Sequence, residues 1–287
     1  VMGRSMAGHL VRAGADVVVH TRTPARAAPL LDAGARWADD PAAAADGAAA
    51  VLTIVGYPSD VRDVYFGRGD GTDAAPSGIL AAAMPGALLI DLTTSAPALA
   101  RRIAAAAVER GLDALDAPVS GGDVGARDAT LSIMVGGEAA AFARAQPILG
   151  ALGRLIVHQG PAGAGQLAKL CNQIAIAGTM FGALEALRFA VSTGLDPTTV
   201  LRSIGAGAAG SWTLTHLFPR AVAGDFAPGF AARHFLKDLR LALDEARGAD
   251  LELPGLALAE RFYARMVEDE GRGDLGTHGL YLTLSGG

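Results

Sequence analysis

The order of apolar runs in the first half of the chain is the feature that most restricts its fold. Between residues 16 and 158, short runs rich in β-branched and apolar residues alternate with Ala-rich stretches of helical character. This alternation is typical of βαβ units and a parallel sheet. The expected strands are Asp16–His20, Ala49–Val55, Ala87–Asp91, Leu112–Asp116, Leu131–Val135 and Leu155–His158. Because these runs are almost continuously apolar, we expect both faces of the strands to be buried.

The second half of the chain has a different pattern, with helical periodicity and no credible strand. Helices are expected first between the strands and then throughout the second half, over Pro24–Ala33, Ser59–Phe66, Pro97–Arg110, Glu138–Leu149, Gln166–Thr193, a run opened by Asp196 and Pro197, Trp212–Val222, Arg233–Arg247, Pro254–Glu268 and Gly276–Leu284. We therefore predict an α/β Rossmann-like domain over residues 1–162 and an all-α domain over residues 163–287, joined by a long interdomain helix.

Composition argues against several classes of partner. The net charge of −5 gives no basic surface for nucleic acid or for an anionic membrane. The longest weakly polar run, Ile174–Leu184, is far shorter than the roughly 20 residues that cross a bilayer, so we expect no membrane span. Cys171 is the single cysteine, which excludes an intrachain disulfide, and no secretory signal is seen at the start. We expect a cytoplasmic protein.

The opening segment, residues 1–14, is expected to form a helix that leads into the strand at Asp16–His20. This order matches the second half of a dinucleotide-binding βαβ unit. Gly3 is then the third glycine of the fingerprint, where it allows close packing of helix on strand, and Met2 and Gly3 lie beside the pyrophosphate. The first strand and the leading glycines would precede Val1, and we expect an isolated fragment without that central strand to be severely destabilised.

The residues after the Asp16–His20 strand bear on the choice of cofactor. Proteins of this fold that select NAD place an acidic residue at this point, whereas this chain has His20-Thr-Arg-Thr23. Arg22 and Thr23 are suited to a 2′-phosphate, which favours NADP and leaves NAD open. The alternative is that Arg22 is a solvated turn residue before Pro24.

A glycine-rich loop follows the expected strand at Leu112–Asp116. It reads Asp116-Ala-Pro-Val-Ser-Gly-Gly122, at the carboxyl end of a strand, where open α/β sheets bind ligands. Ser120 offers a hydroxyl, and Gly121 and Gly122 let backbone N–H groups approach an anion. The loop therefore suits a small substrate that carries a carboxylate. A purely structural glycine turn is the alternative.

Lysine is rare in this chain, since only two of the 24 basic residues, Lys169 and Lys237, are not Arg. An amine loses its proton near neutral pH far more readily than a guanidinium, so each Lys is a candidate for proton transfer. Lys169 shares a helical face with Gln166 and with Asn172, the single Asn. Burial there would lower the lysine pKa from about 10.4 toward roughly 7 to 8. A buried structural lysine is the alternative.

Taken together, these motifs resemble the β-hydroxyacid dehydrogenase family over essentially the whole chain. The motifs that carry the resemblance are Val1-Met-Gly3, Thr21-Arg-Thr23, Ile90-Asp-Leu-Thr-Thr-Ser95, Ala117-Pro-Val-Ser-Gly-Gly122, Gly163-Ala-Gly-Gln-Leu-Ala-Lys-Leu-Cys-Asn172 and Lys237-Asp-Leu239. The resemblance implies a Rossmann-like domain and a helical domain with a cleft between them. It also implies a homodimer or homotetramer.

The resemblance further implies a role for each matched residue. Lys169 is expected to be the catalytic lysine and Asn172 the amide that orients the substrate. Ser120, Gly121 and Gly122 are expected to bind the substrate carboxylate. Cofactor contacts are expected from Met2, Gly3, Arg22, Thr23, Val55, Gly56, Thr94 and Lys237, the last of which also faces the substrate. Val55 and Gly56 stand where the family more often has Leu-Pro.

The predicted function is reversible hydride transfer between NADP(H) and a small 3-hydroxy acid or semialdehyde, with Lys169 as general acid and base. No metal is expected, because the histidines lack the spacing of metal ligands. Two alternatives remain open. One is an imine reductase-like enzyme, which shares the architecture but usually lacks the lysine. The other is a non-catalytic NADP-binding module.

Overall fold

A computed structural model describes residues 2–68 and 77–286 of the chain. Val1, the first residue of the opening motif, lies outside the described residues, as does Gly287. The chain forms two compact units, residues 1–169 (unit 1) and residues 170–287 (unit 2). Unit 1 contains the strands with their covering helices, and unit 2 is helical, so the predicted order of an α/β part followed by an all-α part is confirmed.

The strands of unit 1 form two sheets. In the larger sheet, β3 (Ala50–Thr53), β4 (Leu88–Asp91) and β5 (Asp113–Asp116) are parallel neighbours. The sheet continues through β7 (Leu131–Gly136), which pairs with β5, with β6 (Val119–Ser120) and with β8 (Gly153–Gly160). The smaller sheet contains β1 (Val18–Val19) and β2 (Arg36–Trp37), which are parallel.

The predicted parallel sheet is confirmed for β3, β4 and β5 and for the β7–β8 pair, but β7 runs antiparallel to both β5 and β6. The connection from β5 to β7 holds only β6 and the short helix α7 (Gly122–Arg127). A parallel crossover usually carries a helix long enough to cover the sheet, whereas α7 has six residues and β6 pairs back with β7, so this connection reverses the chain. The strands β2 and β6 were not expected, because neither lies within an apolar run of strand length, whereas the equally short β1 does.

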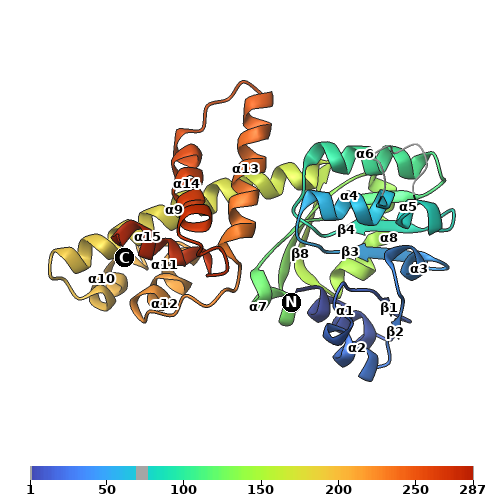
Figure 1. The fold of residues 1–287 in the computed structure, drawn as a ribbon, viewed down its shortest axis with the longest axis horizontal. Coiled ribbons are helices and arrows are strands. Elements are labelled where there is room, and N and C mark those ends of the chain that lie inside the picture. Colours follow the sequence, from blue (N-terminus) through green and yellow to red (C-terminus); the bar gives the residue numbers. More distant parts are fainter. Residues whose placement is uncertain (1, 69–76, 287) are drawn as a thin grey trace. The chain divides into compact units, whose positions relative to one another are not determined.

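The alternation of side chains along β4 builds two cores. Leu88 and Ile90 join the cluster formed with α1 (Met2–Arg12), α7 and α8 (Ala139–Gly150), whereas Leu89 joins the cluster on the opposite face. That second cluster includes α3 (Pro41–Ala45), α4 (Pro58–Phe66), α5 (Ile79–Ala82) and α6 (Pro97–Val108). Figure 1 shows α4 and α6 on one side of β3 and β4, and α1 on the other.

Burial on both faces, expected for every strand, is found for β4 but not for all of them. All four residues of β4 are buried, whereas in β8 Leu155 is 58% and Val157 is 40% exposed. Strand β8 pairs only with β7 among the described strands, so it is an edge strand whose outer face is not covered. An apolar run in the sequence does not distinguish a central strand from an edge strand.

Several expected helices are divided or continued differently in the structure. The Pro24–Ala33 segment is a 3₁₀ turn, η1 (Pro24–Arg26), followed by α2 (Ala28–Asp32). In unit 2, the Trp212–Val222 segment is divided into α11 (Trp212–His216) and α12 (Phe218–Val222). A proline stands in the first turn of α2 and of α12. Proline has no N–H to continue a preceding helix, so a new helix starts at each point.

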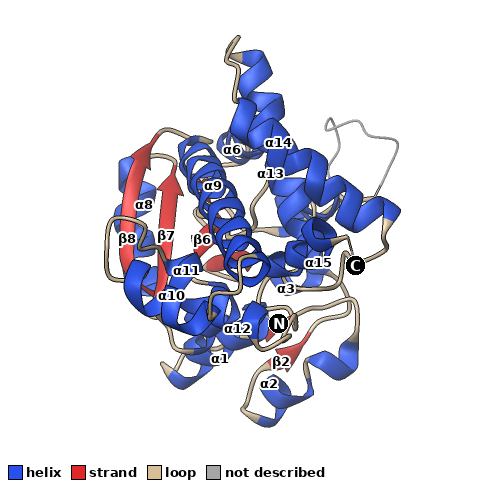
Figure 2. Ribbon diagram, turned by 90° about the vertical axis from the view of Figure 1, so that its left-hand side faces the viewer, coloured by secondary structure: helices blue, strands red, loops and turns tan. Residues whose placement is uncertain are grey.

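The long helix α9 (Ala164–Ser192) begins in unit 1 and continues through unit 2. The core of unit 2 forms where α9 residues such as Leu184 pack with residues of the later helices, including Phe235 and Tyr263. Figure 2 shows that the labelled elements from α10 onward are helical. They are α10 (Pro197–Ile204), α11, α12, α13 (Ala232–Gly248), α14 (Pro254–Ala264), a π-helical turn (Arg265–Asp269), a 3₁₀ turn (Thr277–Gly279) and α15 (Leu280–Ser285).

Helix α9 is longer than the uncharged run from which no membrane span was expected. This 29-residue helix is long and apolar enough for a span by length and composition alone, even though it contains Glu185 and Arg188. The uncharged run Ile174–Leu184 is only part of this helix, which also contains Lys169 and extends beyond Glu185 and Arg188 to Ser192. In unit 2, α9 contributes Leu184 and Leu187 to the core.

Candidate active site

The residues expected to bind ligands in unit 1 lie at one edge of the larger sheet. Strands β3, β4 and β5 are parallel, and Asp91 at the end of β4 is the register partner of Asp116 at the end of β5. The loops that carry Val55 and Thr94 therefore leave the sheet from the carboxyl ends of β3 and β4, and the chain after β5 leads into β6, which ends at Ser120. This edge is where open α/β sheets bind their ligands.

The opening helix packs tightly on the end of β3. A Cβ atom added to Gly3 would lie 2.8 Å from Cγ2 of Ile54, so only glycine allows α1 to approach this closely. Val55 follows Ile54, and its backbone N–H donates a hydrogen bond to Oγ1 of Thr93 at 3.0 Å. The close packing expected of Gly3 is present, and it places α1 beside the loops after β3 and β4.

Asp91 makes hydrogen bonds that fix the loop after β4. Its Oδ1 accepts hydrogen bonds from Thr53 Oγ1 and from the backbone N–H of Thr93, both at 3.0 Å, and Tyr65 lies 3.0 Å from the Thr53 hydroxyl. Burial raises the pKa of Asp91 to about 6, against the lowering effect of these hydrogen bonds, and the nearby Asp116 adds to the rise. A buried acid with several donors around it thus supports the predicted cofactor loop.

Asp116 performs a similar role for the start of α9. Its carboxylate accepts hydrogen bonds from the backbone N–H of Gly163 at 2.7 Å and of Gln166 at 2.8 Å. A carboxylate at a helix N-terminus satisfies N–H groups that have no partner within the helix and is stabilised by the helix dipole. Burial raises the Asp116 pKa, while the backbone hydrogen bonds from Gly163 and Gln166 act in the opposite direction.

Two glycines allow this close contact between the sheet and α9. A Cβ on Gly165 would lie 2.4 Å from the carbonyl oxygen of Met134, and a Cβ on Gly136 would lie 2.5 Å from Oδ1 of Asp116. No ordinary Cβ contact is so short. The first turn of α9 therefore packs directly against the backbone of β5 and β7.

The side chain of Gln166 connects that same turn to the loop after β4. It is fully buried, its Oε1 accepts from the backbone N–H of Ser95 at 2.8 Å, and its Nε2 donates to the carbonyl of Thr93 at 2.7 Å. Thr94, the predicted cofactor contact, lies between these two bonded residues and is partly exposed. Lys169 is three residues after Gln166 on α9 and is 6% exposed.

Ser120 and the two glycines form the predicted carboxylate loop. Ser120 ends β6, paired with Ser132 of β7, and is partly exposed. Gly121 has φ of +131° and Gly122 has φ of +64°, conformations that disfavour residues with a Cβ atom. A Cβ on Gly122 would meet no atom within 4 Å, so the backbone angle alone accounts for this glycine. Asp116, four residues earlier, fixes the strand from which the loop departs.

In unit 2, Asn172 and Lys237 belong to one polar chain. Nδ2 of Asn172 donates to Oε1 of Gln173 at 2.8 Å, Nε2 of Gln173 donates to Oδ2 of Asp238 at 2.6 Å, and Nζ of Lys237 lies 2.9 Å from Oδ1 of Asp238. Gln173 and Asp238 are each 1% exposed. The structure thus joins these two predicted site residues within unit 2 through a buried pair.

Arg22 forms an ion pair with Asp60, which the sequence did not predict. Its Nη1 lies 3.3 Å from Oδ1 of Asp60, and its side chain is 74% exposed. Asp60 also accepts a hydrogen bond from the backbone N–H of Tyr57 at 3.1 Å, beside Gly56 at the start of α4. Arg22 is therefore held near the loop after β3. Thr23 precedes the η1 turn and makes no side-chain capping bond there.

Asp91, Asp116 and Gln166 all stand within the motifs described above, but no role was predicted for any of them from the sequence. The available signal was an acidic residue at the last position of two apolar strands, Ala87–Asp91 and Leu112–Asp116. A carboxyl group in that position needs hydrogen-bond donors when it is buried.

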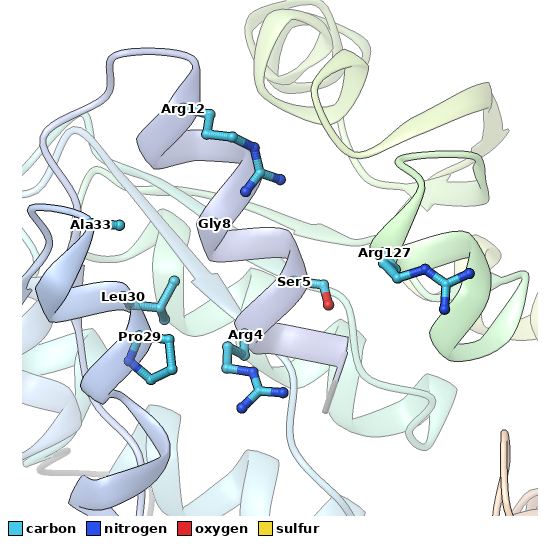
Figure 3. A pocket seen from close by; sticks show the side chains of 8 residues that line it. All are labelled: Arg4, Ser5, Gly8, Arg12, Pro29, Leu30, Ala33 and Arg127. Atoms are coloured by element: carbon cyan, nitrogen blue, oxygen red, sulfur yellow. The ribbon is translucent and has the colours of Figure 1, made fainter.

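One pocket in unit 1 contains none of the predicted site residues. It has a volume of about 240 Å³ and lies between α1 and α2, with the end of α7 at one side (Figure 3). The residues that line it are Arg4, Ser5, Gly8, Arg12, Pro29, Leu30, Ala33 and Arg127.

The fold and the glycine-lined strand edge define a nicotinamide dinucleotide-binding oxidoreductase. Residues 1–160 match the sequence profile of the NAD binding domain of 6-phosphogluconate dehydrogenase. Residues 163–283 match the profile described as NAD-binding of NADP-dependent 3-hydroxyisobutyrate dehydrogenase. The chain belongs to the β-hydroxyacid dehydrogenase family, as its motifs predicted.

Individual relatives agree with this family. A 3-hydroxyisobutyrate dehydrogenase of Pseudomonas aeruginosa is 39% identical over 92% of this chain and 88% of its own length. An NAD-dependent L-serine dehydrogenase of the same organism is 36% identical over 93% of this chain and 89% of its own. The solved structure of Mycobacterium tuberculosis 3-hydroxyisobutyrate dehydrogenase with L-serine has a TM-score of 0.87 at 33% identity, covering 99% of this chain and 95% of that one.

Proposed function

We propose that this protein transfers a hydride between NADP(H) and a small 3-hydroxy acid or its semialdehyde, with Lys169 as general acid and base. The observation that carries the proposal is the position of Gln166, one turn before Lys169 on α9. Gln166 is hydrogen-bonded to both neighbours of Thr94, and its backbone N–H is bonded to Asp116, which precedes the Ser120–Gly122 loop. One helical turn thus connects the lysine with both the cofactor loop and the carboxylate loop.

The residues present fit a nicotinamide dinucleotide. Gly3 lets α1 pack against Ile54, and the loops carrying Val55, Gly56 and Thr94 surround the carboxyl ends of β3 and β4. We propose that Met2 and Gly3 face the pyrophosphate, and that Val55, Gly56 and Thr94 contact the remainder of the cofactor. The bound nicotinamide supplies or accepts the hydride.

The protein residues then have separate chemical tasks. In the oxidation direction, the neutral amine of Lys169 accepts the proton of the substrate hydroxyl, and in the reduction direction its ammonium donates that proton. Ser120, Gly121 and Gly122 bind the substrate carboxylate through the hydroxyl and the backbone N–H groups. Asn172 orients the substrate oxygen. These assignments agree with relatives whose names refer to 3-hydroxyisobutyrate and L-serine, both small hydroxy acids.

We also propose NADP as the preferred cofactor. In support, Arg22 and Thr23 stand after β1 where no acidic residue is available in the His20-Thr-Arg-Thr23 segment. Lys237 is proposed to contact both cofactor and substrate. A homodimer or homotetramer is the proposed assembly, which sedimentation velocity measures directly.

A substrate panel tests the proposal. The purified protein is assayed with NADPH and with NADH against small aldehyde acids and cyclic imines, and with the oxidised cofactors against 3-hydroxy acids. We expect turnover of a 3-hydroxy acid or semialdehyde, with a higher kcat/KM for the NADP pair. Turnover of imines only would support the imine reductase alternative. NADPH binding without turnover of any compound would support a non-catalytic module.

A further inference from the structure

The buried amide of Gln166 makes a two-point contact with the backbone on either side of Thr94. Its Oε1 accepts from the N–H of Ser95 at 2.8 Å, and its Nε2 donates to the carbonyl of Thr93 at 2.7 Å. Thr93 and Ser95 are buried, whereas Thr94 is partly exposed. The amide therefore holds both neighbours of the one residue of this segment that faces outward.

Only a side chain with one donor and one acceptor at its end satisfies both backbone groups. An ionised carboxylate keeps the bond from Ser95 N–H but directs an oxygen at the carbonyl oxygen of Thr93. An apolar side chain of equal length leaves both backbone groups unsatisfied, and burial makes each loss costly. The identity of residue 166 is therefore constrained by hydrogen bonding as well as by size.

The backbone of Gln166 is fixed as well. Its N–H donates to the Asp116 carboxylate at 2.8 Å, and the adjacent Gly165 is in direct contact with the backbone of β5 and β7. A shift of this turn would move Lys169, because Lys169 is on the next turn of the same helix. The side chain of Gln166 thus connects two groups that must be aligned for hydride and proton transfer.

We propose that Gln166 is a positioning residue that fixes the position of Thr94 relative to the turn of α9 that carries Lys169. It contacts neither substrate nor cofactor and acts through its neighbours. The Lys169 part of this inference rests on the proposed function. The claim that Gln166 positions Thr94 requires only that the protein binds a nicotinamide dinucleotide, which the family membership establishes.

Three variants distinguish this role from simple stabilisation of the fold. Q166M keeps the length and removes both hydrogen bonds. Q166E keeps one acceptor, and when its carboxyl group is protonated it regains a donor for Thr93. The exposed Gln146 of α8 gives the matched control Q146E, the same chemical change away from the site.

The pH response of Q166E is set by the charged groups around residue 166. Asp116 on β5 is bonded to its backbone, Asp91 on β4 is next to Asp116, and Lys169 is on the same helix. On α6, Arg101 approaches Gly163 closely. Burial and the two neighbouring carboxylates should raise the pKa of the carboxyl group introduced by Q166E above its usual value near 4.3. Q166E should therefore regain the hydrogen bond to Thr93 within a pH range that the protein tolerates.

The experiment measures NADPH affinity by fluorescence, kcat and KM with the best substrate, and hydrogen exchange of the Ser95 amide, between pH 5.5 and 8. For Q166M we expect kcat to fall about 10- to 100-fold, NADPH to bind roughly 3- to 10-fold more weakly, and the Ser95 amide to exchange faster. Q166E should match Q166M at pH 8 and recover toward the parent protein at pH 5.5. Q146E should match the parent protein throughout.

Two outcomes would overturn the inference. One is a Q166E variant whose NADPH affinity differs from that of the parent protein by the same factor at every pH. The other is a folded Q166M variant with unchanged NADPH affinity and unchanged Ser95 exchange. If Q166M does not fold, the pH response of Q166E decides alone. If no substrate is turned over, the proposed function fails, whereas affinity and exchange still test Gln166.

Discussion

Nε2 of Gln173 donates a hydrogen bond to Oδ2 of Asp238 at 2.6 Å, and this contact links α9 to α13 within unit 2. Each partner is next in sequence to a predicted site residue, Asn172 on α9 and Lys237 on α13. Asn172 donates to Gln173, and Lys237 is ion-paired with Asp238. The buried Gln173–Asp238 pair therefore holds two residues that the sequence identified separately.

Removal of the Asp238 carboxylate should destabilise unit 2. D238A removes the acceptor of the Gln173 amide and the ion pair with Lys237, whose side chain is 12% exposed. We expect a loss of about 3 kcal/mol in the free energy of unfolding, measured with urea. D238N should lose less, because its amide oxygen still accepts from Gln173. The control D244A removes an exposed ion pair with Arg247 and should change stability by less than about 0.5 kcal/mol.

Substitution of Lys169 tests proton transfer. K169A should lower kcat by roughly 10²- to 10⁴-fold while NADPH binding is retained, because only the proton-transfer group is lost. K169R should be almost as slow, since a guanidinium keeps the positive charge but does not release its proton near neutral pH. Steady-state kinetics and fluorescence titration with NADPH measure the two effects. Unchanged turnover in K169A would remove Lys169 from the mechanism.

Two glycines on α9 should respond in opposite directions to alanine. G165A places a Cβ 2.4 Å from the carbonyl oxygen of Met134, so the helix must move away from the sheet. We expect a loss of more than about 2 kcal/mol in unfolding free energy, together with weaker NADPH binding. Gly178 is exposed on the same helix with no atom near its added Cβ, so G178A should gain up to about 1 kcal/mol. Equal effects of the two changes on thermal unfolding would contradict this packing.

The raised pKa of Asp91 should appear as a pH-dependent stability. Burial raises this pKa from 3.8 to about 6, so between these values the folded state binds more protons than the unfolded state. The stabilisation by the protonated form is complete below about pH 4 and is lost as the pH rises through 6, by roughly 3 kcal/mol in total.

The variant D91N isolates this contribution, because it stays neutral and keeps an oxygen that accepts from Thr53 and Thr93. The unfolding free energy of the parent protein minus that of D91N should fall between pH 4 and pH 7. Urea unfolding at unit steps of pH measures this difference. A constant difference over that range would show that Asp91 does not titrate as described.

The pair of Arg22 and Asp60 should influence the choice of cofactor. Asp60 competes with a 2′-phosphate for the Arg22 guanidinium, which lies 3.3 Å away. D60N should therefore bind NADPH about 2- to 5-fold more tightly and leave NADH affinity unchanged, since the exposed ion pair is weak. R22A should weaken NADPH binding selectively. An equal change in the two affinities for either variant would argue against recognition of the 2′-phosphate by Arg22.

Local signals in the sequence predicted much of the fold. Apolar runs located β3, β4, β5, β7 and β8, and helical periodicity located α6, α8, α9 and α13. The Asp16–His20 run also located β1, whereas the short strands β2 and β6 and the short helix α7 were missed, because hydrophobic periodicity is visible only over several residues. The antiparallel course of β7 was also missed, since strand direction depends on the length and path of the connection and not on the strand itself.

By itself, the sequence determined the class of each half of the chain, the family, and the rare residues suited to chemistry, Lys169 above all. Spacing over a few residues was sufficient for these because helical and strand periodicities are local. Only the tertiary structure identified the carboxylates of Asp91 and Asp116 as supports for two loops and Gln166 as the link between them. The physical reason is that these groups are buried, so their hydrogen bonds must be satisfied, and each has a partner 38 to 73 residues away in the chain.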